Sequence, residues 1–137
     1  MYEFQEKVKQ SKQQVSSVKG FFIALILFVI LAASANPLSS WLAESGFNEQ
    51  KADRVYLAAA IKRNLLSYEV AEDLYARIIE AFPEEKEAAL YYLAFCLQRK
   101  GEKQNAIKAY SDYLNLFPSG EFSHKAQVKL KGLMSLR

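Results

Sequence analysis

Cysteine and histidine are almost absent from this chain of 137 residues, which has one of each, Cys96 and His124. A single cysteine excludes a disulfide framework within the chain and any cysteine-rich zinc site. A single histidine leaves no second imidazole for a histidine-based metal site. Only three prolines and five glycines are present, so most of the chain is expected to be regular secondary structure. We therefore expect no metal site and no cofactor.

Catalytic motifs are also missing. The sequence has no glycine-rich phosphate loop, no G-x-S-x-G nucleophile elbow, and no cysteine and histidine in a shared catalytic context. Cys96 lies in an apolar helical segment, as a buried core thiol does. Glu84, Glu85 and Glu87 belong to the first turn of a predicted helix, where the helix dipole favours acids. The chain is therefore predicted to be no enzyme, with no catalytic residues and no small-molecule substrate.

The charge of the chain is slightly basic, with 18 Lys and Arg against 15 Asp and Glu. Four of the bases and two of the acids precede Gly20, which leaves 14 bases and 13 acids in the rest, a net charge of +1. A domain with balanced charge lacks the basic surface that binds a phosphate backbone. We expect no nucleic-acid partner.

Hydrophobic residues are concentrated in one run, Phe21–Ala35, which contains no charged side chain. A helix of this length rises about 22 Å, short of the ~30 Å of a bilayer core. Adding the residues through Leu42, with Trp41 at the interface, supplies the missing length. The run therefore predicts a single transmembrane helix over residues 20–42.

Two other interpretations of this run stay open. Ala33-Ser34-Ala35 fits the small-residue rule of a cleavable signal, and cleavage there would leave a secreted soluble module beginning at Asn36. Lys19-Gly20-Phe21 resembles a prepilin cleavage junction, although Leu25 stands where pilin-like chains carry a glutamate. The stretch before the run is long for a signal, so we favour a retained anchor.

The flanks of the run set the expected orientation. Four lysines precede it, whereas residues 36–50 carry two acids and no base. By the positive-inside rule, the N-terminus is cytoplasmic and the C-terminal domain lies outside the cytoplasm, at the cell (inner) membrane.

Residues 1–19 are predicted to form a cytoplasmic amphipathic helix. Spacings of three and four place one set of residues on a single helix face: Phe4, Val8, Ser11, Val15, Val18 and Phe22. A basic amphipathic helix lies on anionic headgroups. A contact with a partner helix is the alternative.

The C-terminal two thirds of the chain repeat themselves with an offset of 35 residues. The identical pairs are Tyr56 and Tyr91, Ala59 and Ala94, Ala71 and Ala106, Tyr75 and Tyr110, Phe82 and Phe117, and Pro83 and Pro118. Self-similarity at this period indicates an array of helical hairpins. Small alanines allow two helices to approach closely, large tyrosines one turn later fill the space between hairpins, and the prolines end the second helix of each pair.

These residues resemble the tetratricopeptide repeat (TPR) family, whose signature is W-x2-L-G-x2-Y, then A-x3-F, then P. The second copy follows it through Leu90-x2-Leu93-Ala94-x2-Leu97, Gly101, Ala106-x3-Tyr110 and Pro118. The first copy keeps Ala71-x3-Tyr75 and Pro83, but it begins with Val55-x2-Ala58-Ala59-x2-Lys62 and has no glycine at the turn. The resemblance covers Lys51 to Pro118 and implies a protein-binding fold.

The predicted fold class is all-α. The N-terminal amphipathic helix and the single transmembrane helix are followed by a linker (residues 43–49) and a TPR-like domain (residues 50–137) of two repeats plus a capping helix. The expected helices start after Asn48 and end near Asn64, start after Ser67 and end before Pro83, and then span about Glu84–Lys100, Lys103–Phe117 and Glu121–Leu136.

In the TPR family the first helix of each pair lines a concave groove that holds the partner. The resemblance therefore implies a partner-binding groove made of Asp53, Tyr56, Ala60, Arg63 and Asn64 from the first copy and Ala88, Tyr91, Phe95, Gln98 and Arg99 from the second. Tyrosine and arginine are common binding anchors. The alternative is that Tyr56 and Tyr91 only pack between helices.

Taken together, these features predict a membrane-anchored TPR adaptor or scaffold that binds a protein partner outside the cytoplasm and assists assembly or translocation. Its partners would be subunits of a membrane complex. The alternatives are a structural accessory subunit of a larger membrane complex, or the secreted module.

Overall fold

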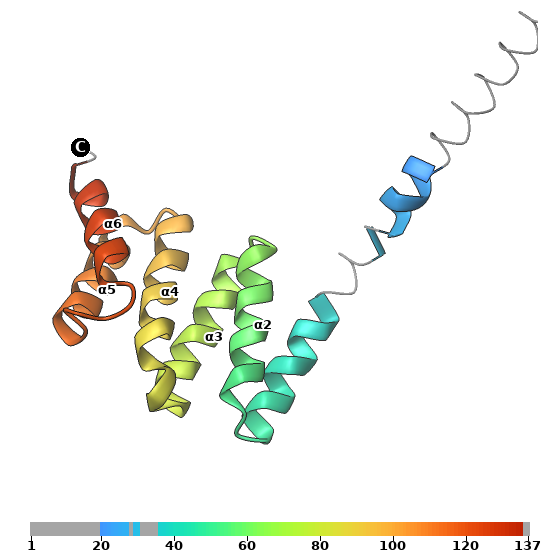
Figure 1. Ribbon diagram of the computed structural model, residues 1–137, viewed down its shortest axis with the longest axis horizontal. Helices are drawn as coiled ribbons and strands as arrows, with labels where there is room; N and C mark the ends of the chain where they lie inside the picture. Colours follow the sequence, from blue (N-terminus) through green and yellow to red (C-terminus); the bar gives the residue numbers. More distant parts are fainter. Residues whose placement is uncertain (1–19, 28, 31–35, 136–137) are drawn as a thin grey trace, which may run out of the picture. The chain divides into compact units, whose positions relative to one another are not determined.

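The computed structural model describes residues 20–27, 29–30 and 36–135, which fall into two compact units, Met1–Asn36 and Pro37–Arg137 (Figure 1). The amphipathic helix predicted for residues 1–19 lies outside the described residues. In the first unit, the described residues 20–27 and 29–30 are helical, and their apolar side chains are exposed.

The prediction of a transmembrane helix is wrong. Across the residues described, no helix has both the length and the apolar character that a membrane crossing needs. The residues predicted to complete the span belong instead to a helix of residues 36–48, in which Ala43 is part of a hydrophobic core. Without them the apolar run is about 22 Å long against ~30 Å of hydrocarbon. The predicted single-pass placement at the inner membrane is wrong for the same reason.

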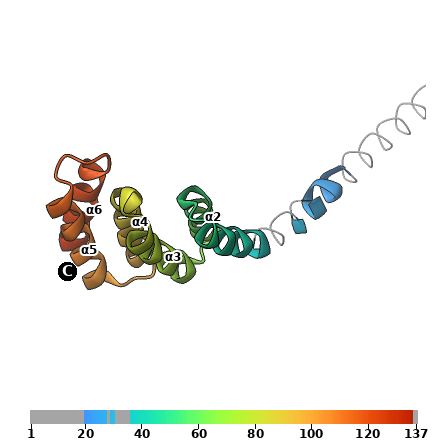
Figure 2. The same ribbon diagram turned by 90° about the horizontal axis from the view of Figure 1, so that it is seen from below.

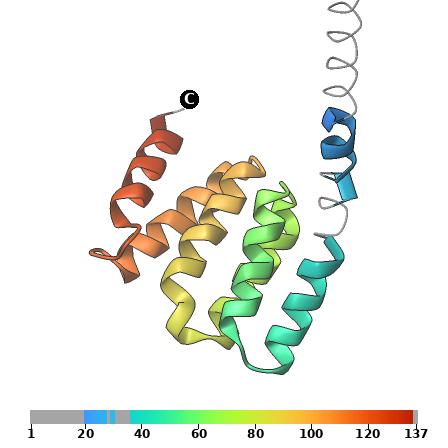
Figure 3. The ribbon, with the colours of Figure 1, turned by 45° about the vertical axis from the view of Figure 1, so that its right-hand side comes forward.

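The second unit is an array of helices (Figures 1 and 3). After the helix of residues 36–48 come α2 (Ala52–Asn64), α3 (Tyr68–Ala81), the short 3-10 helix η1 (Pro83–Glu85), α4 (Lys86–Arg99), α5 (Lys103–Leu116) and α6 (Ser123–Ser135). The bounds of α2 to α6 lie close to those that the repeat pattern predicts. Within residues 36–135 there is no strand.

The helices of the array alternate between two layers. Figure 2 shows α2, α4 and α6 toward one side of the array, and α3 and α5 toward the other. Each helix packs against the next, α2 against α3, α3 against α4, α4 against α5 and α5 against α6. This is the arrangement of stacked hairpins that the offset of 35 residues predicts.

The turns inside the two hairpins have the same backbone geometry, although only one contains glycine. Gly101 has φ of 84°, and Leu66, its equivalent in the first repeat, has φ of 62°. In both turns the following amide donates back to the preceding helix: the Ser67 N–H to the Lys62 carbonyl at 2.9 Å, and the Glu102 N–H to the Leu97 carbonyl at 3.0 Å. The geometry of the turn therefore requires a left-handed backbone conformation at Leu66, which leucine disfavours.

The helix of residues 36–48 continues through most of the predicted linker and is built into the array. At the offset of 35 residues it corresponds to the last part of α3, and Phe47 corresponds to Phe82, on which it stacks at 6.0 Å. Gly46 is packed so tightly that an added Cβ would lie 2.6 Å from the Val55 side chain and 2.9 Å from the Val55 nitrogen. Asn48, predicted to cap the next helix, ends this one, and Lys51 takes the N-cap position of α2.

The α6 helix is attached through one hydrogen-bonded cluster. The Tyr113 hydroxyl donates to the Glu87 carboxylate at 2.9 Å and accepts from the Phe122 N–H at 3.0 Å, while the Glu121 N–H donates to the same carboxylate oxygen at 2.7 Å. Burial, together with the Glu87 carboxylate, raises the pKa of Tyr113 to about 12. On the side that faces the array, Phe122, Ala126 and Leu133 are buried and Leu130 is half-buried.

Replacing Leu66 with glycine is expected to stabilise the fold. A leucine in the left-handed conformation destabilises the folded state by about 1–2 kcal/mol. Glycine removes this strain but increases the conformational entropy of the unfolded state, so we expect a net stabilisation of about 0.5–1 kcal/mol. Leu66 is 67% exposed, so little packing is lost. Urea unfolding measures the change, and Gly101→Ala should lower stability by about 1 kcal/mol through the same backbone preference. A loss of stability in Leu66→Gly would contradict the equivalence of the turns.

Gly46→Ala is expected to destabilise the chain by about 1–3 kcal/mol, because the Val55 backbone cannot yield as a flexible side chain can. The matched control is Gly132→Ala, since a Cβ added at Gly132 would meet no atom within 4 Å and α6 should gain about 0.5–1 kcal/mol of helix propensity. Thermal unfolding of both variants gives the signs. Equal effects would mean that the helix of residues 36–48 does not pack on α2.

Candidate partner-binding groove

Aromatic side chains form a continuous row through the second unit. Its centre is the pair Tyr91 and Tyr92 on α4, whose ring centroids lie 5.3 Å apart. Tyr92 contacts rings of α2 and α3, Tyr91 contacts rings of α5, and both contact Phe122 in the turn before α6. This aromatic row consists of Tyr56, Tyr75, Tyr92, Tyr91, Tyr110, Tyr113, Phe117 and Phe122.

The aromatic row joins the two hydrophobic cores of the array. One core is built around α2 and α3 and the other around α4, α5 and α6, and Tyr92 packs against both. The closest stack is Tyr91 on Phe122, with centroids 4.5 Å apart and planes 14° apart. Such pairs contribute about 0.5–1.5 kcal/mol beyond the area they bury. The positions of α2 and α4, and hence of any groove between them, therefore depend on these rings.

Arg63, near the end of α2, lies on the aromatic row. Its guanidinium stands 4.0 Å from the centroid of the Tyr92 ring, and its Nη1 donates to the Tyr75 hydroxyl at 3.1 Å. The ring face attracts the cation, and the hydrogen bond fixes its direction. Burial raises the pKa of Tyr75, so this acceptor is a neutral phenol. Arg63 is thus held in place without a carboxylate.

The equivalent positions of the second hairpin are also joined by a hydrogen bond, but its donor and acceptor differ. Gln98 stands at the position of Arg63, and Tyr110 at that of Tyr75. There the Tyr110 hydroxyl donates to the Gln98 Oε1 at 3.0 Å. The end of the first helix is therefore tied to the second helix in both hairpins, but only the first hairpin carries a charge at this point.

Arg99, at the end of α4, is held by a second tyrosine. Its Nε donates to the Tyr68 hydroxyl at 3.1 Å, and its guanidinium lies 5.5 Å from the centroid of that ring. Tyr68 also meets Phe95 edge to face, with centroids 6.3 Å apart. The contact links α4 to the first turn of α3. A second arginine therefore lies at the C-terminal end of a helix in the layer of α2, α4 and α6.

Neither arginine is neutralised inside the array. The ion pairs of the described residues join Glu49, Glu72, Asp73 and Glu102 to other bases, and neither Arg63 nor Arg99 takes part in one. Two positive charges, one half-buried and one exposed, are therefore directed by phenol rings and accessible to an anion. An ordered guanidinium binds carboxylates with little further loss of conformational entropy.

The structure divides the ten predicted groove residues by exposure. Asp53, Asn64 and Arg99 are exposed, Tyr56, Ala60, Arg63, Ala88, Phe95 and Gln98 are half-buried, and Tyr91 is buried. Tyr91 packs between helices, as the alternative interpretation of the sequence predicts. Tyr56 also packs between helices, because its half-buried ring contacts Tyr75 and Tyr92 edge to face.

The Tyr56 hydroxyl is buried and has no hydrogen-bond partner in the described part of the chain. Burial is the main cause of the raised pKa of this phenol, with smaller contributions from Tyr75 and Tyr92. An unsatisfied buried hydroxyl costs free energy. The contribution of Tyr56 to the array therefore comes from its ring, and its oxygen is a weak point in the packing.

Repeat matching misses the residues that position the arginines. Tyr92 is paired at the offset of 35 with Leu57, and Tyr68 with Lys103, so neither is a repeated residue. Phe122 lies beyond the second repeat. The signal that could have found them is the Tyr91-Tyr92 doublet, because two adjacent tyrosines on a helix point in different directions and can serve two neighbours.

The described residues contain no group of three His, Cys, Asp or Glu side chains placed to hold a metal ion. Cys96 is fully buried in the core of α2 and α3. Burial raises the pKa of its thiol to about 11. Its thiolate is therefore scarce at neutral pH, and the geometry gives it a packing role.

Cys96 should be almost inert toward thiol reagents in the folded chain. At pH 8 we expect labelling roughly a hundredfold slower than in guanidinium-unfolded protein, since both burial and the raised pKa oppose attack. Asp53→Cys combined with Cys96→Ala provides an exposed thiol on the same array as the control. Labelling of native Cys96 at the rate of the control would contradict the buried position.

Comparison with known proteins adds one match. Residues 88–120 match the family model of the tetratricopeptide repeat. The matched segment covers most of α4, all of α5 and the turn up to Gly120, which is the second of the two predicted repeats. No curated protein matches the chain. The α4 and α5 hairpin is therefore similar to a tetratricopeptide repeat, a unit typical of protein–protein interaction.

Proposed function

We propose that this chain is a non-catalytic adaptor, an accessory subunit of a larger protein complex, which holds a segment of a partner protein against α2 and α4. The match of residues 88–120 to the tetratricopeptide repeat supports a protein-interaction role. In a stack of helical hairpins, the first helices of the pairs, here α2 and α4, form an extended surface that can hold a peptide segment.

The observation that carries the proposal is the pair of directed arginines. Arg63 on Tyr92 and Arg99 on Tyr68 are held by aromatic rings and by hydrogen bonds to phenols, and neither is paired with an acid of the array. A partner segment that presents carboxylates would satisfy both. We infer that the partner segment is acidic.

The remaining predicted residues provide the rest of the contact surface. Ala60 and Ala88 are small and half-buried, so a backbone can approach there, and Phe95 offers a half-buried ring. Asp53 and Asn64 are exposed and provide polar contacts at the margin. Small and aromatic residues flanked by arginine are the composition of a binding surface rather than of a catalytic one.

The test is the double variant Arg63→Gln with Arg99→Gln. In the second hairpin, Gln98 stands at the position of Arg63 and is hydrogen-bonded to Tyr110. Glutamine at position 63 should therefore remove the charge and keep a hydrogen bond to Tyr75. In affinity capture with the full chain, we expect the recovered partner to fall about tenfold or more, and the remaining binding to become less sensitive to salt.

The matched control is Arg54→Gln with Arg77→Gln, which removes two arginines already paired with Glu49 and Asp73. Its partner recovery should stay within about twofold of the unaltered chain, because exposed pairs contribute little. Thermal unfolding of all variants checks that the array is intact. Equal recovery with both double variants would exclude the arginine surface as the binding site.

A further inference from the structure

The α6 helix is the first helix of a repeat that has no second helix among the described residues. At an offset of 37 residues it is in register with α4, and the residues that face the preceding hairpin agree. Ala89 corresponds to Ala126 and Cys96 to Leu133, and all of them are buried. The α6 helix therefore packs on α5 as α4 packs on α3.

Among residues 36–135 nothing covers the other face of α6, whereas the same face of α4 is covered by α5. On α4 this face includes Ala94 and Leu97, which are buried in the core they share with α5. The equivalents on α6 are Lys131 and Met134, and Met134 is 66% exposed. On α4 this face is covered by a single helix, α5, so a single helix is also expected to fit the equivalent face of α6.

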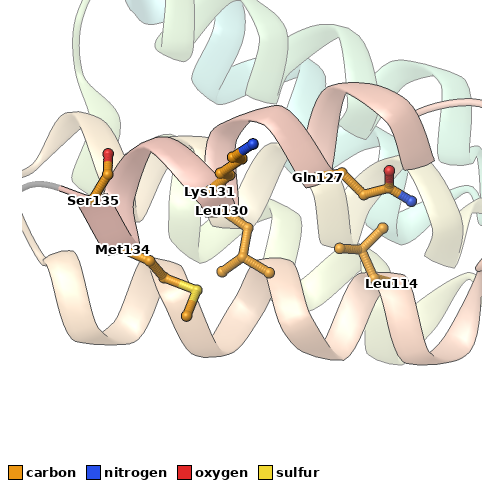
Figure 4. A pocket seen from close by; sticks show the side chains of 6 residues that line it. All are labelled: Leu114, Gln127, Leu130, Lys131, Met134 and Ser135. Atoms are coloured by element: carbon orange, nitrogen blue, oxygen red, sulfur yellow. The ribbon is translucent and has the colours of Figure 1, made fainter.

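An open cleft lies on this face, with a volume of about 430 Å³. It is lined by Leu114 of α5 and by Gln127, Leu130, Lys131, Met134 and Ser135 of α6. Figure 4 shows Leu130 and Met134 directed toward α5, and Leu114 directed toward α6, while the Lys131 amine turns away from them. The lining residues on α6 recur at spacings of three and four, so they form one helix face with an apolar centre and a charged margin.

The charge on α6 specifies the occupant. Lys131 stands where α4 has the buried Ala94, so a helix that covers this face lies over the Lys131 stem and brings its margin close to the exposed ammonium group. A carboxylate on that margin of the covering helix would pair with the ammonium group and favour docking there. The α6 helix itself offers no acid, because its charged residues are Lys125, Lys129 and Lys131.

We propose that the cleft between α5 and α6 binds one amphipathic helix of a partner protein, apolar toward Leu114, Leu130 and Met134 and carrying a carboxylate opposite Lys131. This surface shares no residue with the groove on α2 and α4, so it goes beyond the function proposed above and does not depend on it. A second copy of the array is a poor occupant, because the corresponding faces of its α3 and α5, including Tyr75 and Tyr110, are fully buried.

The test uses a helical peptide as the probe. The peptide copies α5, residues 103–116, because α5 covers the equivalent face of α4. One version is acidic, with Lys103→Glu and Lys108→Glu, and one is basic, with Asp112→Lys. Fluorescence anisotropy with the full chain should give binding of the acidic version about tenfold or more tighter than that of the basic version.

Two variants of the full chain place the binding in the cleft. Lys131→Glu should reverse the preference between the peptides, and Met134→Ala should weaken both about fivefold to tenfold by removing the apolar anchor. Both residues are exposed in the unbound chain, so circular dichroism should show an unchanged fold. Lys125→Glu, on the same helix outside the cleft, is the matched control and should keep the original preference.

Three results would overturn the proposal. The first is no saturable binding of either peptide. The second is binding that is indifferent to Lys131→Glu and Met134→Ala, which would locate the probe elsewhere, for example in place of α5 itself. The third is a dimer in sedimentation that Met134→Lys dissociates, which would make a second copy the occupant.

Discussion

The array depends on the packing of two adjacent tyrosines of α4, Tyr91 and Tyr92, whose rings contact each other and both contact Phe122. Tyr92 closes the core of α2 and α3, and Tyr91 closes the core of α4, α5 and α6, so the two hydrophobic cores are joined through adjacent residues. A helical repeat has few contacts between distant elements, and its stability comes mainly from interfaces between neighbours. The rings at the α4 interface therefore hold the first hairpin and the end of the array together.

The aromatic row also determines where charge is accessible. Arg63 and Arg99 lie against the rings of Tyr92 and Tyr68, which attract the guanidinium without placing a carboxylate beside it. In contrast, Lys100 is bonded to both Glu102 and Glu72, and these hydrogen bonds raise its pKa. Lys100 and Arg99 are neighbours in the chain, yet Lys100 is paired with two acids and Arg99 is held by the Tyr68 hydroxyl.

Both ends of the described array are single helices rather than hairpins. The helix of residues 36–48 matches the second helix of a pair, and α6 matches the first. Such ends cover the outer faces of the two complete hairpins, but each also presents a face of its own. On α2 the exposed Leu57 lies on the side that Tyr92 occupies in α4, and on α6 Met134 lies on the side that Leu97 occupies. Exposed apolar side chains therefore lie near both ends of the described array.

The sequence by itself determined the hairpins, because the signals that end and turn helices are local. Pro83 and Pro118 stop the second helices, Gly101 makes a turn, and alanines at the offset of 35 mark the close contacts. The ends of α3 to α6 could therefore be predicted to within about two residues, whereas α2 begins at Ala52 and not directly after Asn48. The ten predicted groove residues follow from the resemblance to the TPR family and stay a prediction. Only the tertiary structure decided that Tyr91 is interior, that Arg63 and Arg99 are directed by tyrosines, and that residues 36–48 join the array instead of extending an apolar span. Which of two neighbouring tyrosines is buried, and whether a moderately apolar helix finds a partner, depend on residues that are distant in the chain and meet only when the cores form.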